Sequence, residues 1–173
     1  KSRLRVLVIT EDDPLYVIRF FDSFFPSAPS SIEILGVTVM TPFQESLLAT
    51  AFRMYRFYGF LDFTRLGLRF ASEKLRRRSI ARLARDYGIP VIKTTSVNAL
   101  EYLQRVRDLS PDVIVSVAAP ERFQEELLSI PSLGCVNIHS GRLPRFRGMM
   151  PTFWQLLADE SHATITVHEM VAK

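Results

Sequence analysis

Asn137 and His139 are the residues whose types and spacing best suit chemistry. They stand two positions apart at the end of a short apolar run, 134–139 (GCVNIH), which predicts a β-strand with both side chains on one face. In open α/β sheets, ligands bind beyond the carboxyl ends of the strands. There an asparagine N–H can hold a developing oxyanion, while an imidazole transfers a proton or adds positive charge. The pair therefore suits acyl transfer, although Asn and His also cap ordinary turns at strand ends.

The residues around this pair extend the pattern. The stretch GCVNIHSGRLPRFRGMMP resembles the signature of the folate-dependent formyltransferases, the catalytic domain of the methionyl-tRNA formyltransferase type. In that family a strand ends in Asn-x-His and is followed by a short loop, Leu-Pro, a basic residue and glycine. The matching positions are Asn137, His139, Leu143-Pro144 and Arg147-Gly148, with Pro151 also in register. The resemblance is close over 111–170 and looser over the first hundred residues.

This resemblance implies where the formyl donor, 10-formyltetrahydrofolate, and its acceptor would bind. Asn137 would stabilise the oxyanion, His139 would assist by its charge or by proton transfer, and Arg147 and Gly148 would face the acceptor. Folate would lie between two loops, whose residues are Ala119, Pro120, Glu121, Arg122 and Phe123 in the first and Ser140, Gly141, Arg142, Leu143 and Pro144 in the second.

The sequence departs from the family pattern in two places. The family's catalytic aspartate follows the last strand, and neither Asp159 nor Glu169 stands at that position. We therefore expect residues 1–173 to be one catalytic domain that is truncated at its C-terminal end. Glu121 and Arg122 stand where the family loop is mostly apolar. If backbone groups contact the pterin, this change does not affect folate binding. If side chains make those contacts, the folate site is altered.

The acceptor remains open between methionyl-tRNA and the amino group of a sugar nucleotide. Relatives that formylate glycinamide ribonucleotide carry a glycine-rich phosphate loop after the first strand, whereas here the loop 10–14 has three acids and no glycine, which would repel a phosphate. Two alternatives are a formyltetrahydrofolate hydrolase and a non-catalytic folate-binding or docking module. An aspartate immediately after Lys173 would favour an enzyme.

Short apolar runs alternate with helical patterns along the rest of the chain. Strands are predicted at 5–10, 32–40, 90–95, 112–118, 134–139 and 163–170. Helices are predicted from Asp13-Pro14 to about 25, ending at Tyr87-Gly88, over 98–108, from about 121 to 130, and over 152–158; Asn98/Glu101 and Thr152/Gln155 have capping-box spacing. This alternation indicates an α/β, Rossmann-like, doubly wound and mostly parallel sheet.

An extra helical insertion is expected at about 42–78. Its apolar residues recur at helical spacing, with a break near Gly59 that divides it into two helices. Residues 53–85 hold ten basic side chains against two acids. We expect the segment to be structural, with its arginines in solvent and Phe52, Phe57, Phe60 and Phe63 out of water. Docking on tRNA, a membrane surface or a partner is the alternative.

The composition is that of an ordinary globular domain, with 173 residues, 47% hydrophobic, 23% charged, and a net charge of +4. No apolar run reaches transmembrane length, and no signal peptide is evident, so we expect no membrane span and a cytoplasmic location. Three histidines and one cysteine lack zinc-site spacing, so no metal is expected. Cys135 is expected to be buried and inert, and the oligomeric state stays undetermined.

Overall fold

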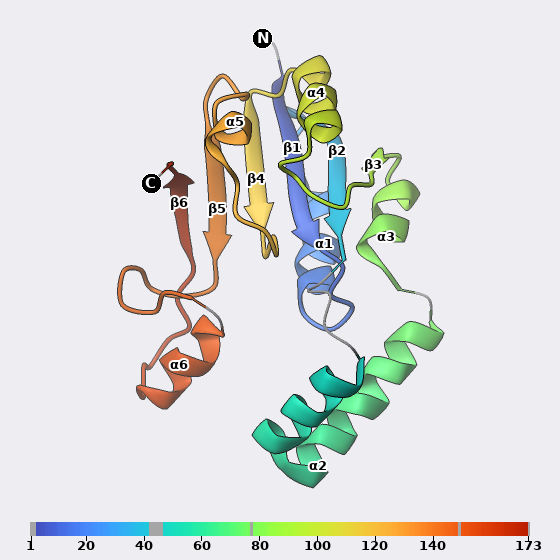
Figure 1. Cartoon of the computed structure of the whole chain (residues 1–173), viewed down its shortest axis with the longest axis vertical. Coiled ribbons are helices and arrows are strands. Elements are labelled where there is room, and N and C mark those ends of the chain that lie inside the picture. Colours follow the sequence, from blue (N-terminus) through green and yellow to red (C-terminus); the bar gives the residue numbers. More distant parts are fainter. Residues whose placement is uncertain (1–2, 42–46, 77, 149, 173) are drawn as a thin grey trace.

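A single mixed sheet organises the chain. The computed structural model describes residues 3–41, 47–76, 78–148 and 150–172. The strands within these ranges are β1 (Leu4–Glu11), β2 (Ile32–Met40), β3 (Val91–Ile92), β4 (Val113–Val117), β5 (Cys135–His139) and β6 (Thr166–Met170). Their spatial order is β3-β2-β1-β4-β5-β6, and only β6 among them is antiparallel to its neighbour (Figure 1). The predicted α/β, Rossmann-like class is confirmed.

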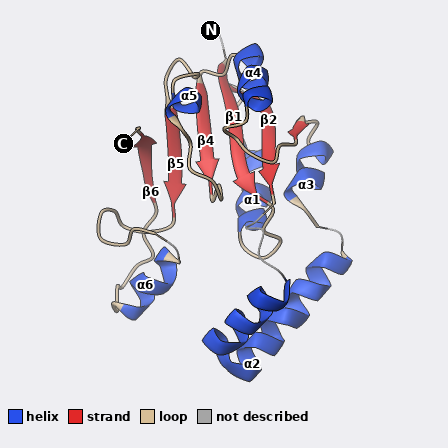
Figure 2. Ribbon diagram, viewed as in Figure 1, coloured by secondary structure: helices blue, strands red, loops and turns tan. Residues whose placement is uncertain are grey.

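Helices cover both faces of the sheet (Figure 2). The helices within the described ranges are α1 (Val17–Ser27), α2 (Leu47–Leu75), α3 (Ile80–Asp86), α4 (Leu100–Leu109), α5 (Glu125–Leu128) and α6 (Pro151–Leu157). Of these, α2 and α6 lie beyond the end of the sheet rather than on a face. On one face Leu7 and Ile9 pack with residues of α4 and α5, and on the other Val6 and Val8 pack with α1 and α3. Because successive strand residues point to opposite faces, the fully apolar run of β1 fills both cores at once.

Several predicted helix starts are wrong for a common physical reason. Asn98 and Thr152 do not cap helices: α4 and α6 begin after Ala99 and Met150 without a side-chain cap. Instead both polar side chains bond to neighbouring loops. Similarly, α1 begins at Val17 because Asp13 first closes a turn onto Leu15 and Tyr16. The helix predicted from 121 is only the single turn of α5.

The predicted insertion is helical, but its expected packing is wrong. Gly59 has φ +72° and breaks α2 into two segments, as its sequence predicts. However, Phe52, Phe57 and Phe60 are 62%, 52% and 69% exposed rather than buried. No helix in the described part of the chain combines the length and apolar character that a bilayer-crossing segment needs. Residues 42–46 and 77 of the predicted insertion lie outside the described residues.

We predict that Cys135 is chemically silent in the folded protein. Its thiol is buried in the core face of β5, and burial raises its pKa to about 12. Since the thiolate is the nucleophile, a thiol reagent at mildly alkaline pH should label the native protein hardly at all. The same reagent should label one cysteine per chain in denaturant, measured by intact mass. Rapid labelling of the native protein would contradict this burial.

Candidate active site

Strand β5 positions the two predicted catalytic residues at the carboxyl edge of the sheet. Asn137 and His139 lie on the face of β5 that also carries Cys135, while Ile138 packs against the opposite core. Both side chains are partly buried, and β5 pairs in parallel with β4 and antiparallel with β6. The pair therefore stands on a strand that is fixed by neighbours on both sides.

The amide of Asn137 is oriented by a histidine that the sequence analysis did not single out. Asn137 Nδ2 lies 3.2 Å from Nε2 of His168, and His168 Nδ1 lies 2.9 Å from the carbonyl oxygen of Glu169. A carbonyl only accepts, so His168 Nδ1 carries the proton and Nε2 of the neutral ring accepts from Asn137. The Asn137 amide has a second N–H, which can serve another acceptor.

His139 is held by the backbone of the loop that follows it. Its Nε2 donates to the carbonyl oxygen of Phe146 at 2.7 Å. Because that bond places the proton on Nε2, the neutral ring keeps the Nδ1 lone pair as a proton acceptor. Phe146 itself is buried, which fixes the position of this carbonyl.

The loop 140–144 is anchored by polar side chains of α6 and β6. Thr166 Oγ1 donates to the carbonyl of Gly141 at 2.7 Å and accepts from the Leu143 amide at 3.2 Å. Gln155, which is buried, donates to the carbonyl of Ser140 and accepts from the Thr164 amide at 3.0 Å. The Leu143–Pro144 peptide is cis. These bonds satisfy loop backbone groups that would otherwise lose water without compensation.

The basic residues beside this loop divide into two groups. Arg142 and Arg145 both donate to Glu160, at 2.7 and 2.8 Å, so their charges are already paired. Arg147 is exposed, and Gly148 has φ +90°, a left-handed conformation that favours glycine. Arg142 and Arg145 are also exposed, so Arg147 differs from them in making no ion pair among the described residues.

Glu121, the main departure from the family pattern, points away from the Asn137–His139 site. Its carboxylate accepts from Ser96 Oγ at 2.7 Å, from the Val97 amide at 2.9 Å and from Asn98 Nδ2 at 2.9 Å. The side chain therefore ties the loop 119–123 to the segment before α4. The rest of the loop follows this anchor: Phe123 is buried in the core, Ala119 and Pro120 are half-buried, and Arg122 is exposed.

The loop after β1 has its own backbone amides occupied. Asp13 Oδ1 accepts from the Leu15 and Tyr16 amides at 2.7 and 3.3 Å, while the Asp12 amide donates to the carbonyl of Met40. Burial, and secondarily Asp13, raises the pKa of Glu11 above its ordinary value. A phosphate would find these amides taken and acidic side chains beside them.

The other cavity and the other side-chain clusters give weaker indications of a functional site. A cavity of about 580 Å³ lies at the opposite end of the sheet, lined by Arg5, Arg107, Asp112 and Glu126 among others, and is separate from Asn137 and His139. Within the described ranges, no three His, Cys, Asp or Glu side chains gather as metal ligands. His168 and Thr166 were not predicted as site residues, and Gln155 was predicted only as a capping-box residue, because only the β5–β6 register and the chain path bring the three to the site.

The fold and the site together define an α/β protein with an Asn–His pair at the carboxyl edge of its sheet. Residues 70–173 match the formyl transferase family, and the chain belongs to that family. This region carries Asn137, His139 and both loops.

Particular relatives agree with this assignment. Methionyl-tRNA formyltransferase from Geobacter metallireducens is 42% identical over 90 residues, which are 52% of this chain but 29% of that protein. The phosphoribosylglycinamide formyltransferase of Anaplasma phagocytophilum has a similar structure (TM-score 0.62, 18% identity, covering 99% of this chain and 67% of that one). A sugar N-formyltransferase from a Shewanella species is also similar (TM-score 0.53, 15% identity, covering 98% and 52%). The two structural matches show a shared fold.

Glu121→Ala should destabilise the protein by about 1–3 kcal/mol, because it leaves the partly buried Ser96, Val97 and Asn98 donors without their acceptor. Urea unfolding followed by circular dichroism measures the change. Glu125→Ala, at an exposed residue of α5 in the same region, is the matched control and should change stability far less. Equal effects of the two substitutions would contradict the anchoring role.

Gly141→Ala should also destabilise the protein, by about 1–3 kcal/mol, and disturb His139. A Cβ at this position would meet Pro151 Cβ at 2.6 Å, the Phe146 carbonyl oxygen at 3.0 Å and His139 Nε2 at 3.1 Å. Gly67→Ala is the control, because its Cβ would meet nothing within 4 Å in the helix α2 and should be neutral or stabilising. Thermal melts of both variants test the opposite signs.

Proposed function

We propose that this protein transfers a formyl group from 10-formyltetrahydrofolate to a primary amine. The observation that carries the proposal is the placement of Asn137 and His139 at the carboxyl edge of β5, inside a region that matches the formyl transferase family. Both side chains are held by contacts that leave one polar group of each available for a reactant. The chain spans 29% of the length of the methionyl-tRNA formyltransferase it matches, so the activity is proposed for the full-length protein.

The roles follow from which atoms are already engaged. The second N–H of Asn137 would donate to the formyl oxygen as negative charge develops there when the amine attacks. His139, with its proton on Nε2, would take the proton of the attacking amine at Nδ1 or, when protonated, add positive charge. The family resemblance implies a catalytic aspartate in the loop after the last strand, and its role in orienting His139 stays a prediction.

The pterin of the formyl donor would lie between the loops 119–123 and 140–144, which follow the paired strands β4 and β5. Glu121 is turned toward Ser96 and Asn98, and Phe123 is buried, so this loop would recognise the ring edge chiefly through its backbone. This arrangement supports the interpretation that glutamate at position 121 leaves the folate site unaltered, because backbone groups contact the pterin. Ser140 to Pro144 would close the other side.

The acceptor that we propose is methionyl-tRNA or an amino-sugar nucleotide, with Arg147 and Gly148 facing it. The occupied amides and the acids of the loop after β1 argue against the phosphate of glycinamide ribonucleotide at that loop. We place the reaction in the cytoplasm, where both acceptors and reduced folates occur.

Replacing Asn137 or His139 with alanine in the full-length protein should lower turnover by about 10²- to 10³-fold, the usual cost of losing an oxyanion donor or a proton-transfer group. Both side chains are only partly buried, so folding should change little. The assay follows formylated amine from 10-formyltetrahydrofolate with methionyl-tRNA and amino-sugar nucleotides as acceptors.

His162→Ala is the control, because His162 is exposed and contacts only its neighbour Ser161 in the described hydrogen bonds. Turnover close to wild type for Asn137→Ala would refute the proposed mechanism. Formate release without any formylated amine would instead identify a hydrolase.

A further inference from the structure

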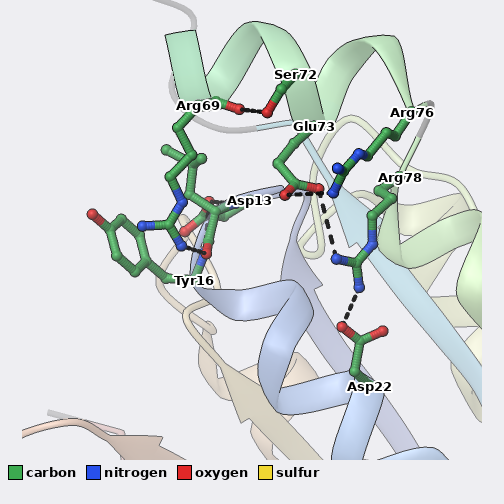
Figure 3. A network of polar contacts seen from close by, with 9 residues as sticks. Asp13, Tyr16, Asp22, Arg69, Ser72, Glu73, Arg76 and Arg78 are labelled. Carbon is green, nitrogen blue, oxygen red and sulfur yellow. Dashed lines mark hydrogen bonds and ion pairs between the residues drawn. The ribbon is translucent and has the colours of Figure 1, made fainter. Parts of the chain in front are cut away.

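Helix α2 turns a row of leucines to solvent and holds its other side to the protein largely through polar contacts. After the break at Gly59, the less exposed side of the helix carries Phe63 and Leu66 together with Arg69 and Glu73. This side is fixed by polar contacts (Figure 3): the Arg69 guanidinium lies 5.6 Å from the ring centre of Tyr16, and Glu73 pairs with Arg78, which also bonds to Asp22 of α1. A surface helix normally packs its apolar side inward.

A row of leucines on the opposite side of the same segment faces outward. Leu61, Leu68 and Leu75 follow one another at seven-residue spacing and are 71%, 68% and 85% exposed. Thr64 and Ala71, also exposed, lie between them on the same face. These leucines therefore form a continuous outward stripe, which Phe60 extends toward the break.

The first segment of α2 and helix α6 continue this surface with aromatic side chains. Tyr55 contacts Phe63 across the break, with ring centres 5.8 Å apart, and Phe57 contacts Phe153 of α6 at 5.5 Å. Trp154, the only tryptophan in the sequence, stands next to Phe153 and is about half exposed. Both helices lie at the end of the sheet where β1, β2 and β5 end (Figure 1). The exposed leucines and aromatic side chains thus form one apolar surface across α2 and α6, and a contiguous exposed apolar surface marks an interaction site.

The charge of helix α2 indicates which kind of partner this surface binds. Helix α2 carries five basic residues and two acids, and Glu73 is engaged with Arg78. A second copy would bring like charges together. Nucleic acid would satisfy the arginines but would leave the leucine stripe in water, whereas an anionic bilayer accepts leucines into its acyl region and arginines at its headgroups. Residues 47–69 also precede the region that matches the family.

We propose that α2, together with Trp154 of α6, is a peripheral docking surface for an anionic lipid membrane. The leucine stripe enters the headgroup–acyl boundary. Basic residues at its borders pair with lipid phosphates: Lys74, and Arg65, whose ion pair with Asp62 is exposed and can be exchanged. The docking is peripheral, in agreement with the lack of a bilayer-crossing helix among the described residues. It stands independently of the formyl-transfer proposal.

Sedimentation of the full-length protein with vesicles tests this surface. Vesicles of phosphatidylcholine with one-third phosphatidylglycerol should bind the protein, pure phosphatidylcholine should bind it far less, and added salt should weaken the binding. The pair Leu61→Ser and Leu68→Ser should reduce binding about ten-fold or more. The control pair, Leu100→Ser at the start of α4 and Leu133→Ser before β5, is similarly exposed but lies outside α2 and α6, and should bind like wild type. The emission of Trp154 should shift to the blue on the anionic vesicles alone.

Several results would overturn the proposal. The proposal is wrong if the folded protein does not bind anionic vesicles, or if the control pair loses as much vesicle binding as the Leu61/Leu68 pair. It is also wrong if the Trp154 emission of the bound protein is unchanged. A dimer that the Leu61/Leu68 variant loses, without vesicle binding, would assign the surface to a second copy. Retention of RNA without vesicle binding would assign it to nucleic acid. Circular dichroism confirms that each variant is folded.

Discussion

The antiparallel pairing of β6 with β5 is the constraint on which the site depends. Its register sets Asn137 opposite His168 and His139 opposite Thr166. Because directly opposed residues share a face, one pairing supplies both the ring that orients the Asn137 amide and the hydroxyl that holds the following loop. A slip of one residue would turn His168 and Thr166 to the other face and dismantle both contacts. The last described strand is therefore as much a part of the site as β5.

Polar side chains, rather than apolar packing, fix the loops around this edge. Glu121 gathers three donors from the segment before α4, and Gln155 joins the loop after β5 to the segment before β6. Loops carry backbone groups that cannot be buried without partners, and these side chains provide the partners. Glu121, which departs from the family pattern, and Asn98 and Thr152, which have the spacing of helix caps, thus act as cross-links between loops.

Helix α2 is held to the protein by a different kind of contact from the helices that cover the sheet. Elsewhere apolar side chains fill the two cores on either side of the sheet, whereas α2 is joined to α1 through Arg69, Glu73 and Arg78 and turns Leu61 and Leu68 outward. Burying those two leucines on the protein would require the helix to rotate and break the polar contacts. The contacts that hold α2 therefore differ in kind from those that hold the helices on the sheet.

The sequence alone determined the α/β class, the order of the strands along the chain, the break at Gly59 and the family, because these depend on local periodicity, on glycine's tolerance of positive φ and on a short local motif. The strand predicted at 90–95 is shorter, Val91–Ile92. The tertiary structure decided the rest. It redirected Asn98 and Thr152 from helix caps to loop contacts and brought His168 to Asn137. It also left Phe52, Phe57 and Phe60 exposed. Each of these outcomes is set by which distant segment lies next to a side chain, and helical or strand spacing carries no information about that neighbour.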